Sequence, residues 1–143
     1  MDVTSLPFNR FVGLEKAPKG SGFLLSLPGS PNYLNHLGAV HASAQLALAE
    51  ASSAEFLLRR FGDVAGMVPV VRRLEAKFRK PASGRISSKA SADEGELAKL
   101  MADLKARGRG LISVSVEIVD ENQVVAMTAV VEWFIAKPEG VDV

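Results

Sequence analysis

One acidic side chain stands apart from the others in this sequence. Glu50 lies in the run 38–54, GAVHASAQLALAEASSA, which is rich in alanine and free of proline. This composition predicts a helix, and no lysine or arginine stands three or four positions from Glu50 to pair with its charge. A carboxylate buried without a partner has a raised pKa and is typical of a group kept for chemistry. Two alternatives stay open: Glu50 reaches solvent, or it pairs with an arginine from another element.

Two polar residues that precede Glu50 are the next candidates for a functional role. His41 stands nine residues before Glu50, and Asn35 stands six before His41. A histidine near a helix start can act as a base or a ligand, or it can simply cap the helix. At about 100° per residue, nine residues put His41 and Glu50 on opposite helix faces. A two-fold dimer would bring Glu50 of one subunit to the His41 region of the other.

Other kinds of site find little support. The chain has no cysteine and only two histidines, so neither a thiolate nucleophile nor a metal site is expected. The segment 28–31, PGSP, lacks the spacing and the lysine of a phosphate-binding loop. A basic run follows in the second half, and it is either a solvated strand face or a patch for a phosphorylated carrier or cofactor. Its members are Arg72, Arg73, Lys77, Arg79, Lys80 and Arg85.

Composition narrows the class of protein. With 143 residues, the chain is expected to form a single domain, residues 1–143. Its 17 basic and 16 acidic residues leave a net charge of +1, which argues against nucleic-acid binding. No basic start followed by an apolar run, and no stretch able to span a bilayer, is visible. The expectation is therefore a soluble, cytoplasmic protein without a membrane partner.

The elements that must position these residues follow from periodicity. Residues 11–17 and 23–27 predict two short strands, separated by the turn-forming run PKGSG at 18–22. Residues 38–61 predict the long helix, buried on several sides in its first half, emerging into water over 55–60 and capped by Gly62. Leucines and a methionine at helical spacing predict a second, amphipathic helix over 93–107, with Asp93 as its N-cap.

Four strands complete the pattern. Residues 68–79 alternate, with Val68, Val70, Leu74, Ala76 and Phe78 expected on one face, although Arg72 interrupts it. Residues 85–92 predict a neighbouring strand, and residues 112–118 and 124–135 predict two long strands joined by a turn at 120–122. The last strand is apolar on both faces, which indicates a central or doubly covered position. The order predicts an α+β fold, with a curved antiparallel sheet wrapped around the long helix.

A family resemblance sharpens this interpretation. Residues 35–43, NHLGAVHAS, followed by LAE at 48–50, resemble the motif of hotdog-fold acyl-CoA thioesterases. That motif is an asparagine, then Gly-x-x-His-Gly-Gly, then an acidic residue nine positions after the histidine. The group that this sequence resembles is the phenylacetate-pathway and hydroxybenzoyl-CoA type, including a thioesterase branch of little-known function. The order of elements agrees with that fold from residue 11 to residue 136.

The resemblance implies an acyl-thioester hydrolase with active sites shared across a homodimer. Glu50 would be the nucleophile or the base that activates water, and the amide N–H of Ala42 would polarise the thioester carbonyl. Asn35 would orient water or hold the thioester, and His41 would support that end of the site. Arg79, Lys80, Arg85 and Gln45 are the expected substrate contacts. Coenzyme A would enter as part of the substrate, without a separate cofactor.

The departures from the motif matter for activity. Ala42-Ser43 replaces the family's Gly-Gly, and the second helix, about 93–108, looks like an insertion that could shape the pocket. A non-catalytic acyl-CoA-binding module is the alternative function, and a dehydratase of the same fold is a third. The sequence leaves open the length and the aromatic or aliphatic nature of the acyl group. It also leaves open CoA against carrier protein, and a dimer against a dimer of dimers.

Overall fold

Six antiparallel strands form one sheet in the computed structural model, which describes residues 1–62 and 66–140. The strand order is β1-β2-β4-β5-β6-β3, and every neighbouring pair is antiparallel. The strands are β1 (Glu15–Lys16), β2 (Leu25–Leu27), β3 (Val68–Phe78), β4 (Ile86–Ser91), β5 (Arg109–Val119) and β6 (Val125–Ala136). The helices are α1 (Pro7–Val12), α2 (Ala42–Phe61) and α3 (Glu94–Arg107), with short 3₁₀ turns at Val3–Ser5, Pro31–Tyr33 and Pro138–Gly140. This confirms the predicted α+β class.

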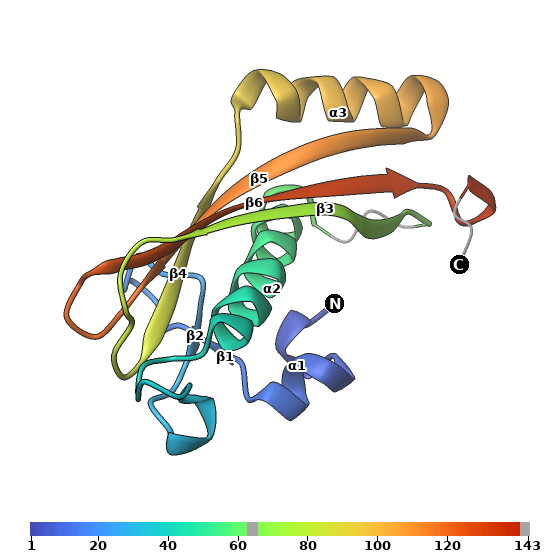
Figure 1. Ribbon diagram of the computed structural model, residues 1–143. Helices are drawn as coiled ribbons and strands as arrows, with labels where there is room; N and C mark the ends of the chain where they lie inside the picture. Colours follow the sequence, from blue (N-terminus) through green and yellow to red (C-terminus); the bar gives the residue numbers. More distant parts are fainter. Residues whose placement is uncertain (63–65, 141–143) are drawn as a thin grey trace.

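The long helix α2 lies against one face of the curved sheet, so that the sheet wraps around it (Figure 1). Its small residues allow this close approach, because Ala49, Ala51, Ser52 and Ser53 are all fully buried. The sequence predicted a start at residue 38, but the helix begins at Ala42. His41 caps it, and residues 38–41 form an irregular segment before it. It ends as predicted, since Gly62 adopts a positive φ of 72° and donates its N–H to the Leu58 carbonyl.

The C-terminal half of α2 corrects one expectation. Residues 55–60 were expected to emerge into water, but Glu55 is only 5% exposed. Its carboxylate accepts a hydrogen bond from Arg59 Nε at 2.9 Å, one helical turn away. The pairing at i,i+4 compensates the buried charge. Only Arg59 and Arg60 reach the surface there.

The predicted strand over 11–17 is wrong over its first half. Phe11 and Val12 belong to α1, which starts with Pro7 at its first position and ends where Gly13 takes a left-handed conformation, φ 96°. Proline suits the first turn of a helix and glycine its end. Only Glu15 and Lys16 pair as a strand, with Ser26 and Leu25 as their partners.

A bulge in β3 corrects the predicted face pattern. Val70 pairs with Phe134, Leu74 pairs with Val131, and the register shifts between Val71 and Arg73. Phe134 and Val131 are three positions apart on β6, an odd step, so they lie on opposite faces of the sheet. Val70 and Leu74 therefore do not share a face, because Arg72 is the extra residue that reverses the alternation.

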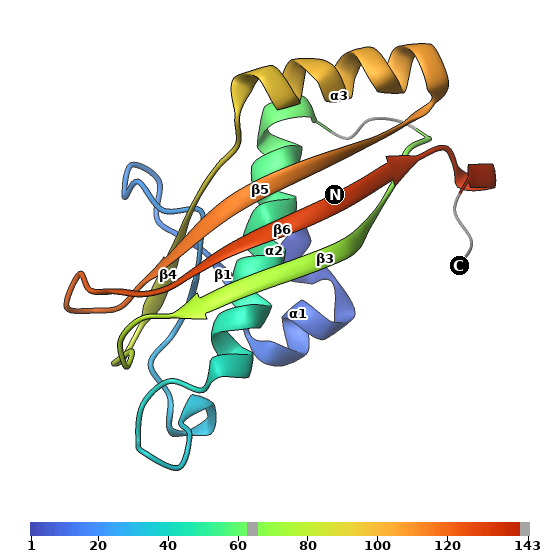
Figure 2. The same ribbon diagram turned by 45° about the horizontal axis from the view of Figure 1, so that its top comes forward.

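The second helix lies where predicted, at the margin of the sheet. Asp93 caps α3 by accepting the Glu96 N–H at 2.9 Å, and Gly108 ends it. Of β5, strand β4 contacts only Ser115–Val119, so within the described part of the chain the first half of β5 has no strand on that side. Helix α3 runs along this first half of β5 instead (Figures 1 and 2).

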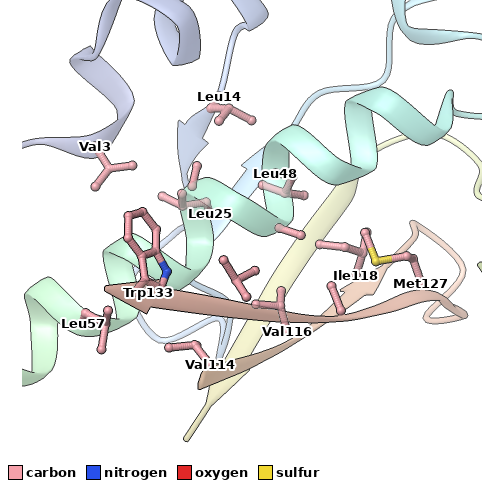
Figure 3. Close-up of a cluster of buried hydrophobic side chains, with 14 of the residues drawn as sticks. Val3, Leu14, Leu25, Leu48, Leu57, Val114, Val116, Ile118, Met127 and Trp133 are labelled. Carbon is pink, nitrogen blue, oxygen red and sulfur yellow. The ribbon is translucent and has the colours of Figure 1, made fainter. Parts of the chain in front are cut away.

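The core lies between α2 and the concave face of the sheet (Figure 3). Leu48 from α2 and Leu25 from β2 are fully buried, as are Val114 and Ile118 from β5 and Met127 from β6. The last strand is central, between β5 and β3, as its composition predicted. At the β5–β6 turn, the Asp120 carboxylate accepts the Asn122 and Val124 N–H groups, which confirms the turn expected at 120–122.

Candidate active site

Glu50 lies on the half-open face of α2, away from the strands that bury the opposite face. Its side chain is half-buried, and no described residue donates a hydrogen bond to its carboxylate or forms an ion pair with it. Burial raises the pKa of Glu50 above its ordinary value, and desolvation is the cause. Of the two alternatives, pairing with an arginine is not seen within the described residues, whereas Glu50 is only half-buried and therefore still reaches solvent. An unpaired, partly desolvated carboxylate is chemically suited to accept a proton.

A hydrogen-bond chain holds the turn of α2 that carries Glu50. Ser53 Oγ donates to the Glu50 carbonyl oxygen at 2.7 Å, and Trp133 Nε1 on β6 donates to Ser53 Oγ at 2.9 Å. Ser53 and Trp133 are both buried. The chain ties the backbone of Glu50 to the sheet while leaving its carboxylate free of partners.

Asn35 shapes the loop in front of α2. Its side-chain oxygen accepts the N–H groups of Leu37 and Ala39 at 2.9 and 3.1 Å, and its backbone N–H donates to the Ala39 carbonyl. Gly38 stands at the tip of this tight loop with φ 76°. The side-chain oxygen of Asn35 is therefore occupied by backbone N–H groups. Its side-chain nitrogen is left to face a ligand, because no described residue accepts a hydrogen bond from it.

His41 takes a structural part. It is exposed, its Nδ1 accepts the Ser43 N–H at 3.0 Å, and its backbone N–H donates to the Tyr33 carbonyl at 2.7 Å. A ring nitrogen that accepts a hydrogen bond carries no proton, so the proton of this imidazole lies on Nε2. The capping role, one of the two roles considered from the sequence, is the one seen.

A cleft of about 410 Å³ opens at the N-terminal end of α2. It brings together five of the residues singled out from the sequence, namely Asn35, Ala42, Gln45, Arg79 and Lys80. Leu37, Ala39, Val40, Phe78 and Pro81 complete its lining. The Ala42 N–H has no acceptor within the described residues, and it lies at the positive end of the helix dipole. This cleft can hold an anionic or strongly polarised oxygen.

Gln45 lines this cleft from a buried position. The residue is 4% exposed, and its Nε2 donates to the Val40 carbonyl at 3.2 Å. Its Oε1 is buried without a hydrogen-bond partner among the described residues. An unpaired buried acceptor is costly in a finished fold and is found where a ligand or water completes the site.

The basic residues divide between two places. Arg79 and Lys80 are exposed at the cleft, and Arg79 Nε donates to Thr128 Oγ1 at 3.1 Å. The structure does not bring Arg85 to them. Its guanidinium pairs with Glu15 at 3.0 Å and also donates to Ser26, at the β1–β2 side of the sheet. Sequence proximity had grouped Arg85 with the other two, but the turn over 81–84 separates them.

Glu50 and the cleft are apart within one subunit. Glu50 does not line the cleft, and eight residues separate it from Ala42, which is about 12 Å along a helix axis. The predicted site residues therefore form two groups, the N-terminal cleft and the carboxylate of Glu50.

Sequence reasoning missed an apolar cavity at the other end of α2. Its volume is about 100 Å³, and it lies between the C-terminal half of α2 and helix α3. The sequence carried no signal for it, because Met101 read only as part of the apolar stripe of the second helix, whereas the structure leaves it 43% exposed at the cavity. No three His, Asp or Glu side chains gather as a metal site in the ranges that the structure describes, and no helix there is long and apolar enough to cross a membrane.

Comparison with protein families places the chain. Residues 22–135 match a family model described as a domain of unknown function, DUF4442. The chain belongs to this family. A search of curated proteins found no match.

Solved structures share the fold of this DUF4442 protein. A Pseudomonas aeruginosa protein described as a "probable thioesterase" is 26% identical, with a TM-score of 0.79 over 94% of this chain and 91% of that one. A Bacillus halodurans protein with CoA is 17% identical, with a TM-score of 0.67 over 90% of this chain and 74% of that one. A Staphylococcus aureus protein described as a thioesterase is 16% identical, with a TM-score of 0.68 over 90% of this chain and 98% of that one. The fold is the hotdog fold of the thioesterase superfamily, as the resemblance implied.

Proposed function

We propose that this DUF4442 protein is an acyl-thioester hydrolase that cleaves acyl-CoA or acyl-carrier-protein thioesters. The observation that carries the proposal is Glu50, an unpaired and partly desolvated carboxylate on the central helix of a hotdog fold. The likeness to structures described as thioesterases supports the reaction class.

Glu50 acts as the general base or as the nucleophile. In the first case, its carboxylate takes a proton from water as the water oxygen bonds to the thioester carbon. The negative charge that forms on the carbonyl oxygen is held by the Ala42 N–H at the helix N-terminus. The carbon–sulfur bond then breaks, and the proton on Glu50 passes to the departing thiolate. The products are a carboxylic acid and a thiol.

The reaction needs Glu50 and Ala42 beside one thioester, which a single subunit does not provide across about 12 Å of helix. A two-fold dimer supplies Glu50 from one subunit and the N-terminal cleft from the other. The outer edge of β3 supports such an assembly, because among the described residues this eleven-residue strand ends the sheet and pairs with β6 alone. An unpaired edge of that length is a ready surface for a second copy of the chain.

The cleft holds the polar part of the substrate. The Asn35 amide and the Gln45 carbonyl oxygen face the thioester or the pantetheine arm, which offers both N–H and C=O groups. Arg79 and Lys80 stand at the surface, where the phosphates of coenzyme A would meet positive charge. CoA in the Bacillus halodurans structure supports this kind of ligand. Arg85 is left out, because Glu15 already holds it.

A spacing in one relative supports the choice of Asn35 and Glu50. Two structures of the same Staphylococcus aureus protein carry alanine in place of a glutamine and of a glutamate that stand fifteen positions apart. Asn35 and Glu50 are also fifteen positions apart. An amide and a carboxylate at this separation are the pair that the proposed mechanism uses.

The test is thiol release from short, long and aromatic acyl-CoAs by the wild type and by Glu50→Gln. Loss of a general base lowers the turnover number by about 10²–10⁴-fold, whereas binding of a non-hydrolysable acyl-CoA analogue should persist. Glu117→Gln, an exposed glutamate on β5, is the matched control and should keep full turnover. Equal turnover in Glu50→Gln and the wild type would overturn the mechanism. Binding without any release would favour the acyl-CoA-binding module instead.

A further inference from the structure

The apolar cavity beside α3 has no part in the chemistry above. Its lining comes from the C-terminal half of α2, the start of β3, the end of β6 and helix α3, with Met1 at one side. All of its lining residues are apolar or glycine: Met1, Ala54, Leu57, Leu58, Phe61, Gly62, Met67, Pro69, Leu100, Met101, Leu104, Trp133 and Ile135. A cavity with no polar side chain suits a ligand that has no polar group at that depth.

The cavity continues the face of α2 that carries Glu50. Ala54 and Leu57 follow Glu50 by four and seven residues, and Phe61 follows by eleven, which is the spacing of one helical stripe. At 1.5 Å per residue, the lining begins about 6 Å beyond Glu50 and ends about 16 Å beyond it. A group held at Glu50 therefore reaches the cavity only if it extends for one to three helical turns along α2.

Trp133 links the two places. Its indole N–H is already bound to Ser53, so the ring presents only apolar surface to the cavity. Figure 3 shows Trp133 beside the C-terminal half of α2, near Leu57. The same Ser53 hydroxyl holds the backbone of Glu50. One wall of the cavity and the backbone of Glu50 are thus fixed to each other.

Helix α3 closes the cavity from the other side. Leu100 and Leu104 are buried, while Met101 lines the cavity and remains 43% exposed. Methionine is unbranched and adapts to a ligand more readily than leucine does. The position of Met101 makes it a flexible part of the wall, between the cavity and solvent.

We infer that this cavity holds the distal part of a long aliphatic acyl chain and that α3 limits the chain length. The inference rests on the proposed function and names its substrate class. A benzoyl or phenylacetyl ring would stay beside the thioester carbon, short of the cavity, and a hydroxylated ring would meet no polar partner inside it. An unbranched chain passes Ala54 and ends against Leu104 and Phe61.

The first test measures binding without catalysis. Trp133 is the only tryptophan in the chain, so its fluorescence reports on the cavity directly. Titration with free fatty acids from butyrate to palmitate should shift the emission. The affinity should rise about fourfold for each methylene that enters the cavity, up to the length at which the cavity is full. Phenylacetate should leave the emission unchanged.

The second test places a charge at the cavity. Met101→Lys should lower the affinity for decanoate at least tenfold and should lower kcat/KM for decanoyl-CoA relative to butyryl-CoA by a similar factor. Ala102→Lys adds the same charge on the exposed side of α3, next in sequence, and should change neither. Ala54→Leu narrows the passage from Glu50 and should act on the same ratio, while leucine keeps the helix propensity of the site.

The outcomes separate this inference from the proposed function. If the fatty-acid affinity does not grow with chain length, or if Ala102→Lys weakens binding as much as Met101→Lys, the cavity is not an acyl site. If binding behaves as expected but no acyl-CoA is cleaved, the cavity inference stands and the hydrolase proposal fails. If the wild type cleaves aromatic and short acyl-CoAs as well as decanoyl-CoA, the hydrolase stands and the inference is overturned.

Discussion

At the residue scale, the decisive property is the protonation of Glu50. The residue has no basic neighbour on its own helix, and folding brings none among the described residues. Desolvation is therefore uncompensated, and the pKa of Glu50 is raised. Glu55 offers the contrast five residues later, because Arg59 meets its buried carboxylate. One helix thus carries a paired glutamate with a structural role and an unpaired one that is available for chemistry.

The raised pKa predicts the acid limb of the activity profile. A base or nucleophile must be ionised, so kcat for decanoyl-CoA should fall as the pH drops through the pKa of Glu50. The midpoint should lie above 4.5, the ordinary value for this carboxyl. The measurement is kcat against pH, and Glu117→Gln, the exposed control on β5 that keeps Glu50, should show the same limb. A midpoint at or below 4.5 would contradict the role given to Glu50.

The same shift predicts how stability depends on pH. Because the pKa of Glu50 is raised in the folded state, the folded state binds the proton more tightly than the unfolded state does. Ionisation of Glu50 therefore lowers the free energy of unfolding as the pH rises above 4.5. Glu50→Gln removes this cost. Its Tm should exceed that of the wild type at neutral pH, and the difference should shrink to nothing on acidification below 4.5. A Tm difference that is the same at every pH would indicate a packing effect instead.

At the scale of elements, the contact between α2 and β6 positions Glu50. The Ser53 hydroxyl accepts a hydrogen bond from the indole N–H of Trp133 and donates one to the Glu50 carbonyl oxygen. Both partners lie in the core, where an unmade hydrogen bond is expensive. Small residues elsewhere on α2 let the sheet approach closely. The two hydrogen bonds of Ser53 determine which turn of the helix contacts β6.

Ser53→Ala tests that contact. The substitution leaves the buried Trp133 N–H without an acceptor, so the free energy of unfolding should fall by about 1–3 kcal/mol. Ser43→Ala is the control, because Ser43 is exposed on the same helix and should change stability by less than about 0.5 kcal/mol. Denaturant unfolding followed by circular dichroism measures both. Equal losses in the two variants would mean that the Ser53 hydroxyl contributes nothing.

At the scale of the whole molecule, the separation of Glu50 from the N-terminal cleft is the feature to explain. The cleft lies at the N-terminal end of α2, and Glu50 lies further along the same helix. Strand β3 is the last strand of the described sheet, and its outer edge is open. A two-fold dimer would join unlike groups from two subunits, and it would do so twice. Each subunit would then depend on the other for half of its site.

Mixing two inactive variants tests this arrangement. Glu50→Gln lacks the carboxylate and Asn35→Ala lacks the cleft amide, so each homodimer should be inactive. After joint unfolding and refolding, half of the dimers are mixed, and each mixed dimer has one site with both groups intact. The mixture should recover about a quarter of wild-type turnover. Activity that stays at the level of the separate variants would show that both groups act within one subunit.

The sequence by itself determined the two long helices, most of the strands and the identity of the unpaired glutamate. These depend on local properties, namely the alanine content of residues 42–61, the alternation in β5 and β6, and the absence of a basic residue near Glu50. Periodicity failed where one residue changes the pattern, as Arg72 does in β3, and where a short helix replaces a strand, as in α1.

Only the tertiary structure decided which residues share a site. Arg79 and Lys80 line one cleft with Asn35 and Gln45, although more than thirty residues of sequence separate the two pairs. Arg85 instead forms an ion pair with Glu15. Packing also leaves Gln45 Oε1 without a hydrogen-bond partner among the described residues. It also formed the cavity between α2, β6 and α3, whose walls are ordinary apolar residues in the sequence. The physical reason is that helix and strand patterns arise from neighbours along the chain, whereas a cleft, a cavity or an unpaired charge depends on packing between distant elements.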